Sequence, residues 1–461
     1  MKTLTKDEIE NFSAIFHGRI VTSEDSDYDE IRSIWNAMID RRPAIIARCS
    51  GTADVVSCIK FARDTGIDFS IRGGGHNIAG SSIRDNGLMI DLSMMKSVFV
   101  DSKKRIAYVE PGATLGDMDH ETQLYGLATS LGINSTTGIA GLTLGGGFGW
   151  LSRKYGMTVD NLIAAQVVTA NGESIRVSDD EHADLFWAIR GGGGNFGIVT
   201  RFEFQLHPVG PETFSGMIVF PFESAKSILQ HYREYTAKLR DELSIWSVIR
   251  KAPPLPFLPE EVHGKEVVVM AFLYTGDEKE GEALIAPLRE FAKAHGEFTG
   301  MMPYKAWQQI FDPLLTPGSR NYWKSHNFEI LNDETIDVIT DYASKIPSMA
   351  SEIFIAQMGG YTSRQPLNKT AYVHRKANYI MNVHARWDES HEDALCIDWA
   401  RAFFNSATPY AMGGAYVNFM TEEEQERVPA AYGENYARLS EIKEKYDPDN
   451  IFNLNQNIKP S

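Results

Sequence analysis

The sequence predicts an α+β protein, and three features of the chain support this. Residues 1–210 alternate short strand and helix patterns with unusually many glycines. Residues 211–412 have longer apolar strands separated by amphipathic helices, which suits an antiparallel sheet with helices on one side. Hydrophobic residues make up 43% of the 461-residue chain, enough for a large core. We therefore expect two domains, 1–210 and 211–412, followed by a C-terminal segment, 413–461.

Short apolar runs between glycine and lysine turns give the elements of the first domain. A helix is expected to start at the capping residue Thr52 and to end at Gly66. Hairpins are expected around the Lys-rich turn 102–104 and around Asn171 and Gly172. The other expected elements are strands at 43–47, 68–72, 88–93 and 198–206 and helices at 115–125 and 182–189.

The second domain and the tail follow the same reasoning. Thr421 and Glu424 have the spacing of a capping box, and helical spacing continues from Tyr436 to Tyr446. In the second domain we expect strands at 217–220, 243–249, 266–274, 352–358 and 378–387 and helices at 222–240, 278–295 and 333–346.

Composition excludes several classes of partner. The formal net charge of -16 disfavours nucleic acid and anionic membranes. The N-terminus, MKTLTKDEIENF, is polar, and no apolar run approaches the length of a membrane span. Cys49, Cys58 and Cys396 lack metal-ligand spacing and indicate buried free thiols in a reducing compartment. We expect a cytoplasmic enzyme, and the sequence leaves its oligomeric state open.

Four glycine clusters stand beside apolar strands, at 73–75, 145–147, 191–194 and 413–414. Each alone would suit a surface loop, but together they favour backbone amides that surround an anion such as phosphate. The spacing of Gly192, Gly194 and Gly197 matches the dinucleotide fingerprint, but here a helix precedes and a strand follows, the reverse of the required order. The sequence also lacks the nucleotide-hydrolase loop GxxxxGK[ST]. The pattern therefore predicts a diphosphate ligand held in neither standard way.

His76 directly follows the first glycine cluster and could touch such a ligand. The alternative is a histidine whose hydrogen bonds are made within a turn. The remaining histidines show neither HxxxH nor HExxH spacing, so we expect no metal site.

The motifs together carry a family resemblance over nearly the whole chain. SIRGGGHN, TTGIAGLTLGGGFGWLSRKYGMTVDNL, FWAIRGGGGNFGIVT and a closing NLNQNI resemble, in this order, the motifs of the berberine bridge enzyme-like FAD-linked oxidases of the vanillyl-alcohol oxidase/p-cresol methylhydroxylase superfamily. The resemblance implies a discontinuous FAD-binding domain of two α+β lobes, to which segment 413–461 returns. It also implies an α/β substrate domain with an antiparallel sheet that is covered by helices and lies over the flavin ring.

FAD is the diphosphate ligand that the resemblance implies. His76 matches the histidine that bonds covalently to the flavin 8α-methyl carbon in that family. The residues that match further cofactor contacts are Arg72, Gly73, Gly74, Gly75, Asn77, Thr137, Gly138, Gly141, Thr143, Gly145, Gly146, Gly147, Asn161, Ile198, Val199, Asn418 and Asn455.

Two positions depart from the family pattern. Many relatives have a second tether, a cysteine, where this chain has Asn134, so we expect one covalent bond, through His76 only. Thr137 stands where plant relatives have a Val or Leu that influences oxygen access, which leaves oxidase or dehydrogenase behaviour open.

Tyr416 matches an active-site tyrosine of bacterial relatives and is the candidate catalytic base. On a strand it would share a face with Asn418. Because a free tyrosine has a pKa of about 10, it would need a nearby cation or donor, for which Arg375 and Lys324 are candidates. The alternative is a core aromatic with its hydroxyl bonded. Substrate contacts are expected from strand-like stretches of the second domain, at Trp246, Tyr322, Gln357, Tyr379 and His384.

The resemblance therefore implies an FAD-linked oxidase of a small alcohol, amine or sugar. Hydride would pass to flavin N5, and oxygen would accept the electrons to give hydrogen peroxide. The alternatives are a flavin dehydrogenase with another acceptor and a catalytically idle flavin-binding coat protein.

Overall fold

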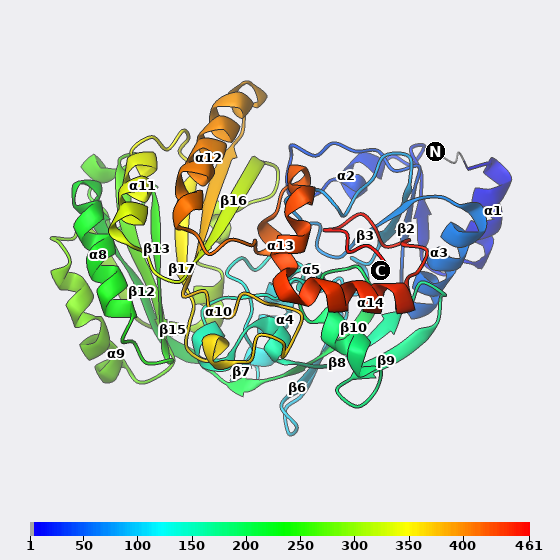
Figure 1. Cartoon of the computed structure of the whole chain (residues 1–461), viewed down its shortest axis with the longest axis horizontal. Helices are drawn as coiled ribbons and strands as arrows, with labels where there is room; N and C mark the ends of the chain where they lie inside the picture. The colour runs from blue at the N-terminus through cyan, green and yellow to red at the C-terminus, as the bar shows by residue number, and fades with distance from the viewer. Residues whose placement is uncertain (1–3) are drawn as a thin grey trace.

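The computed structural model describes residues 4–461 (Figure 1). The first lobe has a four-stranded sheet in the order β1-β2-β4-β3, in which β2 and β3 run parallel to β4. Its elements are α1 (Lys6–Ile15), β1 (Arg19–Val21), α2 (Tyr28–Arg32), β2 (Ile45–Arg48), α3 (Thr52–Thr65), β3 (Phe69–Arg72) and β4 (Leu88–Asp91).

Helix α3 ends as predicted but begins differently. Gly66 follows it in the left-handed conformation, with φ 71. The prediction that Thr52 caps its N-terminus is wrong, because Gly51 occupies the cap position and Thr52 is the first helical residue. Asp54 in the first turn instead accepts the backbone N–H of Ser50 at 2.9 Å and so closes the turn.

The second lobe has a five-stranded antiparallel sheet in the order β5-β6-β10-β8-β9. The two predicted hairpins, β5–β6 and β8–β9, are confirmed, and Gly172 has φ 75 at the second turn. The elements are β5 (Val98–Asp101), β6 (Ile106–Val109), α4 (Leu115–Gln123), β7 (Leu127–Ala128), α5 (Ile139–Leu144), α6 (Ser152–Tyr155), β8 (Leu162–Val168), β9 (Ser174–Ser178), α7 (Ala183–Ile189), β10 (Ile198–Gln205) and β11 (His207–Pro208).

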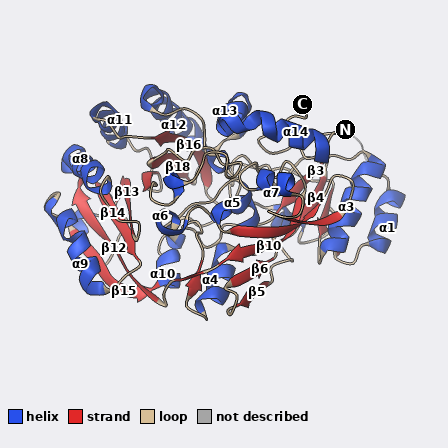
Figure 2. Ribbon diagram, turned by 60° about the horizontal axis from the view of Figure 1, so that its bottom comes forward, coloured by secondary structure: helices blue, strands red, loops and turns tan. Residues whose placement is uncertain are grey.

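A seven-stranded antiparallel sheet, in the order β15-β12-β14-β13-β17-β18-β16, follows. Its strands are β12 (Glu212–Pro221), β13 (Leu243–Lys251), β14 (Glu266–Tyr274), β15 (Gly296–Pro303), β16 (Arg320–Phe328), β17 (Glu352–Gln357) and β18 (Tyr379–Trp387). One face packs against four helices, α8 (Ala225–Thr236), α9 (Glu278–Ile285), α11 (Asp333–Ala343) and α12 (Asp393–Ala407), while the short α10 (Tyr304–Gln308) lies near α4 (Figure 2).

The strands and helices expected in this domain did not include β15, β16, α10 or α12. The sequence patterns also overestimated α9, because Pro287 lies in a 3₁₀ turn, Ala286–Glu290, that follows the helix. All three cysteines are buried free thiols, as predicted. Within residues 4–461, no helix combines the length and the apolar character that a bilayer crossing needs.

The tail crosses back to the first domain (Figure 1). Helices α13 (Val428–Tyr432) and α14 (Tyr436–Tyr446) lie over it, and α14 contacts α7. The buried ammonium of Lys443 donates to Asp447 at 2.5 Å and to the carbonyl oxygens of Asn195 at 2.8 Å and Phe452 at 2.9 Å. The predicted capping box of Thr421 is confirmed, although it opens a 3₁₀ turn, Glu422–Arg427. The domain limits at residues 210 and 412 stay predictions.

Candidate active site

An elongated groove is lined by both lobes and the tail. One end is lined by the 193–199 loop and by residues 451–456. The other end is a cavity of about 230 Å³ that reaches the seven-stranded sheet. The residues that line both parts, and so make them continuous, are Ile71, Gly73, Asn77, Ser81, Gly141, Asn418 and Asn455.

The two lobes meet at Gly74 and Gly138. A Cβ on Gly74 would lie 2.6 Å from the backbone nitrogen of Gly138, and a Cβ on Gly138 would lie 2.5 Å from that of Gly74. Only glycine permits this approach, since real Cβ contacts are not that short. These glycines therefore allow the two loops to pack closely along the groove. This packing role is separate from the anion binding that the glycine clusters predict. An extended groove lined by bare backbone fits a dinucleotide such as FAD.

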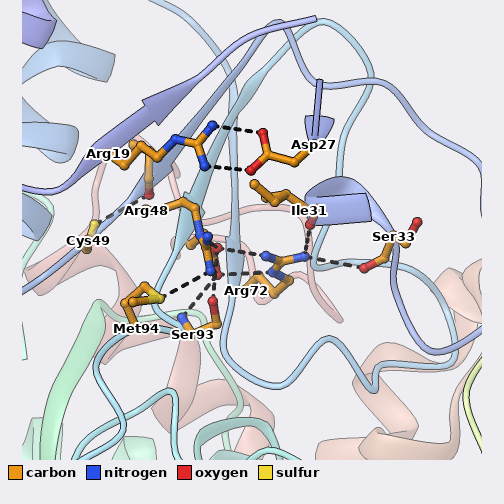
Figure 3. Close-up of polar contacts among 11 residues, drawn as sticks. Arg19, Asp27, Ile31, Ser33, Arg48, Cys49, Arg72, Ser93 and Met94 are labelled. Carbon is orange, nitrogen blue, oxygen red and sulfur yellow. Dashed lines mark hydrogen bonds and ion pairs between the residues drawn. The ribbon is translucent and has the colours of Figure 1, made fainter. Parts of the chain in front are cut away.

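Arg72 lies behind this loop and does not line the groove. Its guanidinium donates to Asp91 at 3.1 and 2.7 Å and reaches the carbonyl oxygens of Ile31 and Ser33 (Figure 3). Arg48 also donates to Asp91, at 3.1 Å. Burial raises the pKa of Asp91, but Arg72 and hydrogen bonds from Ser93 outweigh it and hold the pKa below its ordinary value. The expectation that Arg72 wraps a diphosphate is corrected: all of its hydrogen bonds are used to fix the loop.

His76 lines the cavity end of the groove. Its imidazole stacks on Trp35, with ring centroids 4.3 Å apart and an interplanar angle of 22°. Desolvation lowers the pKa of His76 to about 3, so the ring is neutral at physiological pH. Its Nε2 is buried and has no hydrogen-bond partner among residues 4–461. A neutral imidazole with an unused nitrogen fits a covalent bond to a cofactor in this cavity.

Tyr416 lines the same cavity, and its hydroxyl oxygen accepts two hydrogen bonds. The backbone N–H of Gly147 and the side-chain amide of Asn418 each donate to it at 3.0 Å. Burial raises the pKa of Tyr416 to about 12, although both donors lower it. The strand on which Tyr416 and Asn418 were expected is a 3₁₀ turn, Val417–Phe419, so they meet by a direct hydrogen bond instead.

Neither candidate cation supports Tyr416. Arg375 forms a bidentate ion pair with Asp160, at 2.6 and 2.8 Å. Lys324 bonds to Thr421 at 3.2 Å and pairs with Glu423 at 2.9 Å. The expectation that one of them lowers the Tyr416 pKa is wrong, because both charges are neutralised elsewhere.

The alternation of side chains along each strand determines which of the expected substrate residues face the cavity. Trp246 and His384 line the cavity. Tyr322, Gln357 and Tyr379 do not, and expecting substrate contacts from them is wrong. Tyr322 and Tyr379 belong to the helix-covered core, and the amide of Gln357 donates to the carbonyl of Thr236 in α8 at 3.0 Å. Since Tyr379 and His384 are five residues apart on one strand, they face opposite sides.

The structure adds cavity residues that the sequence did not single out. On β17 these are Glu352 and Phe354, which have the parity opposite to Gln357. The same alternation could have found them. The cavity is also lined by Trp35 in a loop, Phe419 in the 3₁₀ turn and Trp323 on β16. No sequence period marks Trp35 or Phe419.

The expected cofactor residues fall into two groups. The first lines the groove: Gly73, Gly74, Gly75, Asn77, Thr137, Gly138, Gly141, Ile198, Val199, Asn418 and Asn455. The second lies outside its lining: Arg72, Thr143, Gly145, Gly146, Gly147 and Asn161. The amide of Asn161 donates to the carbonyls of Tyr155 and Met157 and its oxygen bonds to His207, which corrects its assignment to cofactor. Within this second group, Gly147 donates its backbone N–H to Tyr416, and Gly145 lies against the side chain of Asn418.

Asn134, at the position of the second tether, faces the same cavity as His76. Its oxygen accepts the backbone N–H of Thr136 at 2.9 Å, and its amide donates to Leu315 at 3.3 Å. Cys49, Cys58 and Cys396 line neither part of the groove.

Comparison with known proteins agrees with this geometry. Residues 43–178 match the model of an FAD binding domain, and residues 415–459 match the berberine and berberine-like model. An FAD-linked oxidoreductase of Dictyostelium discoideum is 33% identical, with 98% of this chain and 97% of that protein covered. (R)-6-hydroxynicotine oxidase of Paenarthrobacter nicotinovorans is 30% identical, with 96% and 97% covered.

Solved structures agree as well. 6-Hydroxy-D-nicotine oxidase from Arthrobacter nicotinovorans superposes with a TM-score of 0.86 at 28% identity, covering 97% of this chain and 98% of that one. Residues 4–461 thus have the vanillyl-alcohol oxidase type of fold, with an FAD-binding domain. The chain belongs to the berberine bridge enzyme-like family and is an FAD-linked oxidoreductase.

Proposed function

We propose that this oxidoreductase is an oxidase of a small alcohol, amine or sugar that uses oxygen as its electron acceptor and releases hydrogen peroxide. The observation that carries the proposal is the meeting of His76 and Tyr416 in one cavity beside the seven-stranded sheet. The relatives named for nicotine oxidation support the oxidase assignment. We place the enzyme in the cytoplasm because its three cysteines are free thiols.

In this proposal, different residues of the chain accept the proton and contact the substrate. When bound, FAD would accept the hydride from the substrate and would pass the electrons on to oxygen. Tyr416 takes the proton from the substrate O–H or N–H, and Gly147 and Asn418 donate to the same oxygen, which favours its ionised form. Trp246 and His384 contact the substrate from the sheet side of the cavity.

His76 holds the flavin covalently, and it is the single tether. Its unpartnered, neutral Nε2 supports the bond, and Asn134, which offers no thiol in the same cavity, supports a single attachment. The remaining groove glycines and Asn77, Thr137, Ile198, Val199 and Asn455 hold the rest of the cofactor through backbone and amide groups.

An oxygen electrode and a peroxidase-coupled assay test the function together. With a substrate that bleaches the flavin under anaerobic conditions, we expect one peroxide for each oxygen consumed. Oxygen-independent turnover with an artificial acceptor, without peroxide, would instead show a dehydrogenase. Flavin that no alcohol, amine or sugar bleaches would favour an idle binding protein.

A further inference from the structure

The inner face of the seven-stranded sheet, opposite the helices, is divided into an apolar and a polar half. On β12, β14 and β13, the residues in register are Val219, Val269 and Val248. The next row continues this apolar half with Met217, Ala271 and Trp246. A third row, which begins at Arg250 on β13 and continues through Glu352, His384 and Trp323 on β17, β18 and β16, contains charged and polar side chains. A ligand on this face therefore meets two different environments.

The apolar half forms the floor of a second cavity of about 400 Å³, here called the chamber. The loops 252–258 and 310–315 form its other walls, with Trp150 and Ile133. Phe298, 44% exposed, stands at its rim and stacks with Phe257. The chamber has the size of a site for a ring system with substituents.

Among residues 4–461, only Arg250 and Glu352 line the chamber with charged groups. They are partners in register across β13 and β17 and form an ion pair at 2.8 Å. Burial raises the pKa of Glu352, but Arg250 and His384 outweigh it, so the carboxylate stays ionised and the pair is neutral. The chamber thus carries no net charge to attract an ionic ligand.

The chamber joins the catalytic cavity. Ile133, Trp246, Leu315, Glu352 and Phe354 line both. A molecule bound beside Tyr416 therefore has room to extend past the Arg250–Glu352 pair into apolar surroundings.

We propose, on the basis of the proposed function, that the substrate is an alcohol or amine carried on an apolar aromatic or alkyl body, and that the chamber binds this body. A saccharide does not fit this class, because its hydroxyls would lose their hydrogen bonds to water against a wall of valine, leucine and phenylalanine side chains. An apolar body gains free energy there in proportion to its buried area. The polar group of the substrate lies toward Glu352 and Tyr416.

The test is calorimetric binding of a homologous series to the holoenzyme. The ligands are benzyl alcohols with para-methyl, -ethyl, -propyl and -butyl groups, with cellobiose for comparison. We expect affinity to rise about fourfold per added methylene until the chamber is full, and cellobiose to bind more weakly than every member. Equal affinity along the series, or tighter binding of cellobiose, would overturn the proposal.

Substitutions at Val248 test whether the gain in affinity per methylene arises in the chamber. Val248 lines the chamber but not the catalytic cavity, so Val248→Phe should abolish the gain per methylene while Val248→Ala keeps it. Ile330→Phe, at a side chain 62% exposed elsewhere, is the matched control and should keep the gain. A gain that survives in Val248→Phe would contradict the assignment to the chamber, and Val248→Ala keeps the test valid if the larger side chain prevents folding.

Flavin bleaching is recorded on the same samples and tests the proposed function separately. A rising affinity series without bleaching would support the chamber and count against the oxidase. Bleaching by cellobiose with a flat series would support the oxidase and overturn the chamber.

Discussion

The indole of Trp35 lies flat against the imidazole of His76, with ring centroids 4.3 Å apart. Trp35 is itself held on two sides. Its Nε1 donates to the carbonyl of Leu315 at 3.1 Å, and the Arg386 guanidinium lies 5.2 Å from its ring centroid. Trp35, in the loop after α2, and Arg386, on the seven-stranded sheet, thus hold the histidine that lines the cavity.

We predict that Trp35→Ala slows covalent flavin attachment by roughly two- to tenfold, the value of one lost ring stack. Trp35→Phe should restore it, because a phenyl ring can stack on the imidazole. The measurement is in-gel flavin fluorescence during reconstitution of the apoprotein with FAD. Unchanged attachment in Trp35→Ala, with normal FAD binding, would show that the stack does not position His76.

The pKa of about 12 for Tyr416 predicts an alkaline activity profile. Because the base must be ionised, kcat/KM should rise about tenfold per pH unit from neutral pH toward pH 10. Tyr416→Phe should lower kcat/KM by roughly 10²- to 10⁴-fold and flatten the profile. A profile that is already flat between pH 7 and pH 9 in the parent enzyme would contradict the role of Tyr416.

Because Gly145 has no side chain, it leaves room for the contact between Asn418 and Tyr416. A Cβ at Gly145 would lie 2.2 Å from the Asn418 side-chain oxygen, so Gly145→Ala should displace this amide and lower kcat by about a hundredfold. Gly51→Ala is the matched control, since its Cβ meets nothing within 4 Å. Steady-state kinetics decides the point: equal kcat in the two variants would mean that the Asn418 contact is dispensable.

Asp91 accepts hydrogen bonds from Arg48 and from Arg72, the residue before the glycine loop that leads to His76. Asp91→Asn breaks a buried ion pair, so we expect a loss of about 3–5 kcal/mol in the stability of this lobe and a lower melting temperature. Because the folded pKa of Asp91 is depressed, its contribution is present above the unfolded pKa of about 4 and is lost as pH falls through the lower folded value.

The melting temperatures of parent and Asp91→Asn should therefore converge in acid. Exposed Asp180→Asn serves as the control and should melt like the parent at every pH. A constant difference between parent and Asp91→Asn down to strongly acid pH would contradict this sign.

Sequence reasoning succeeded where a local rule determines the structure. The turn at Asn171 and Gly172 and the end of α3 at Gly66 follow from backbone preferences of single residues. The family motifs located His76 and Tyr416, which the fold brings into one cavity.

The sequence did not predict the positions of side chains that depend on residues distant in the chain. Asp91 lies 19 residues from Arg72 and removes that guanidinium from the groove. Trp35 lies in a loop without any period, so only the fold places it on His76. Tyr379 and Gln357 are a different case, because strand parity was readable and would have separated them from His384 and Glu352.

The attachment of flavin to His76 is tested most directly by acid precipitation of the purified protein followed by a visible spectrum of the pellet. We predict that the yellow colour stays with the parent pellet and moves to the supernatant in His76→Ala. The absorbance should correspond to one flavin per chain, with the spectrum of a single linkage. Colour that stays in the His76→Ala pellet, or that leaves the parent pellet, would contradict the assignment.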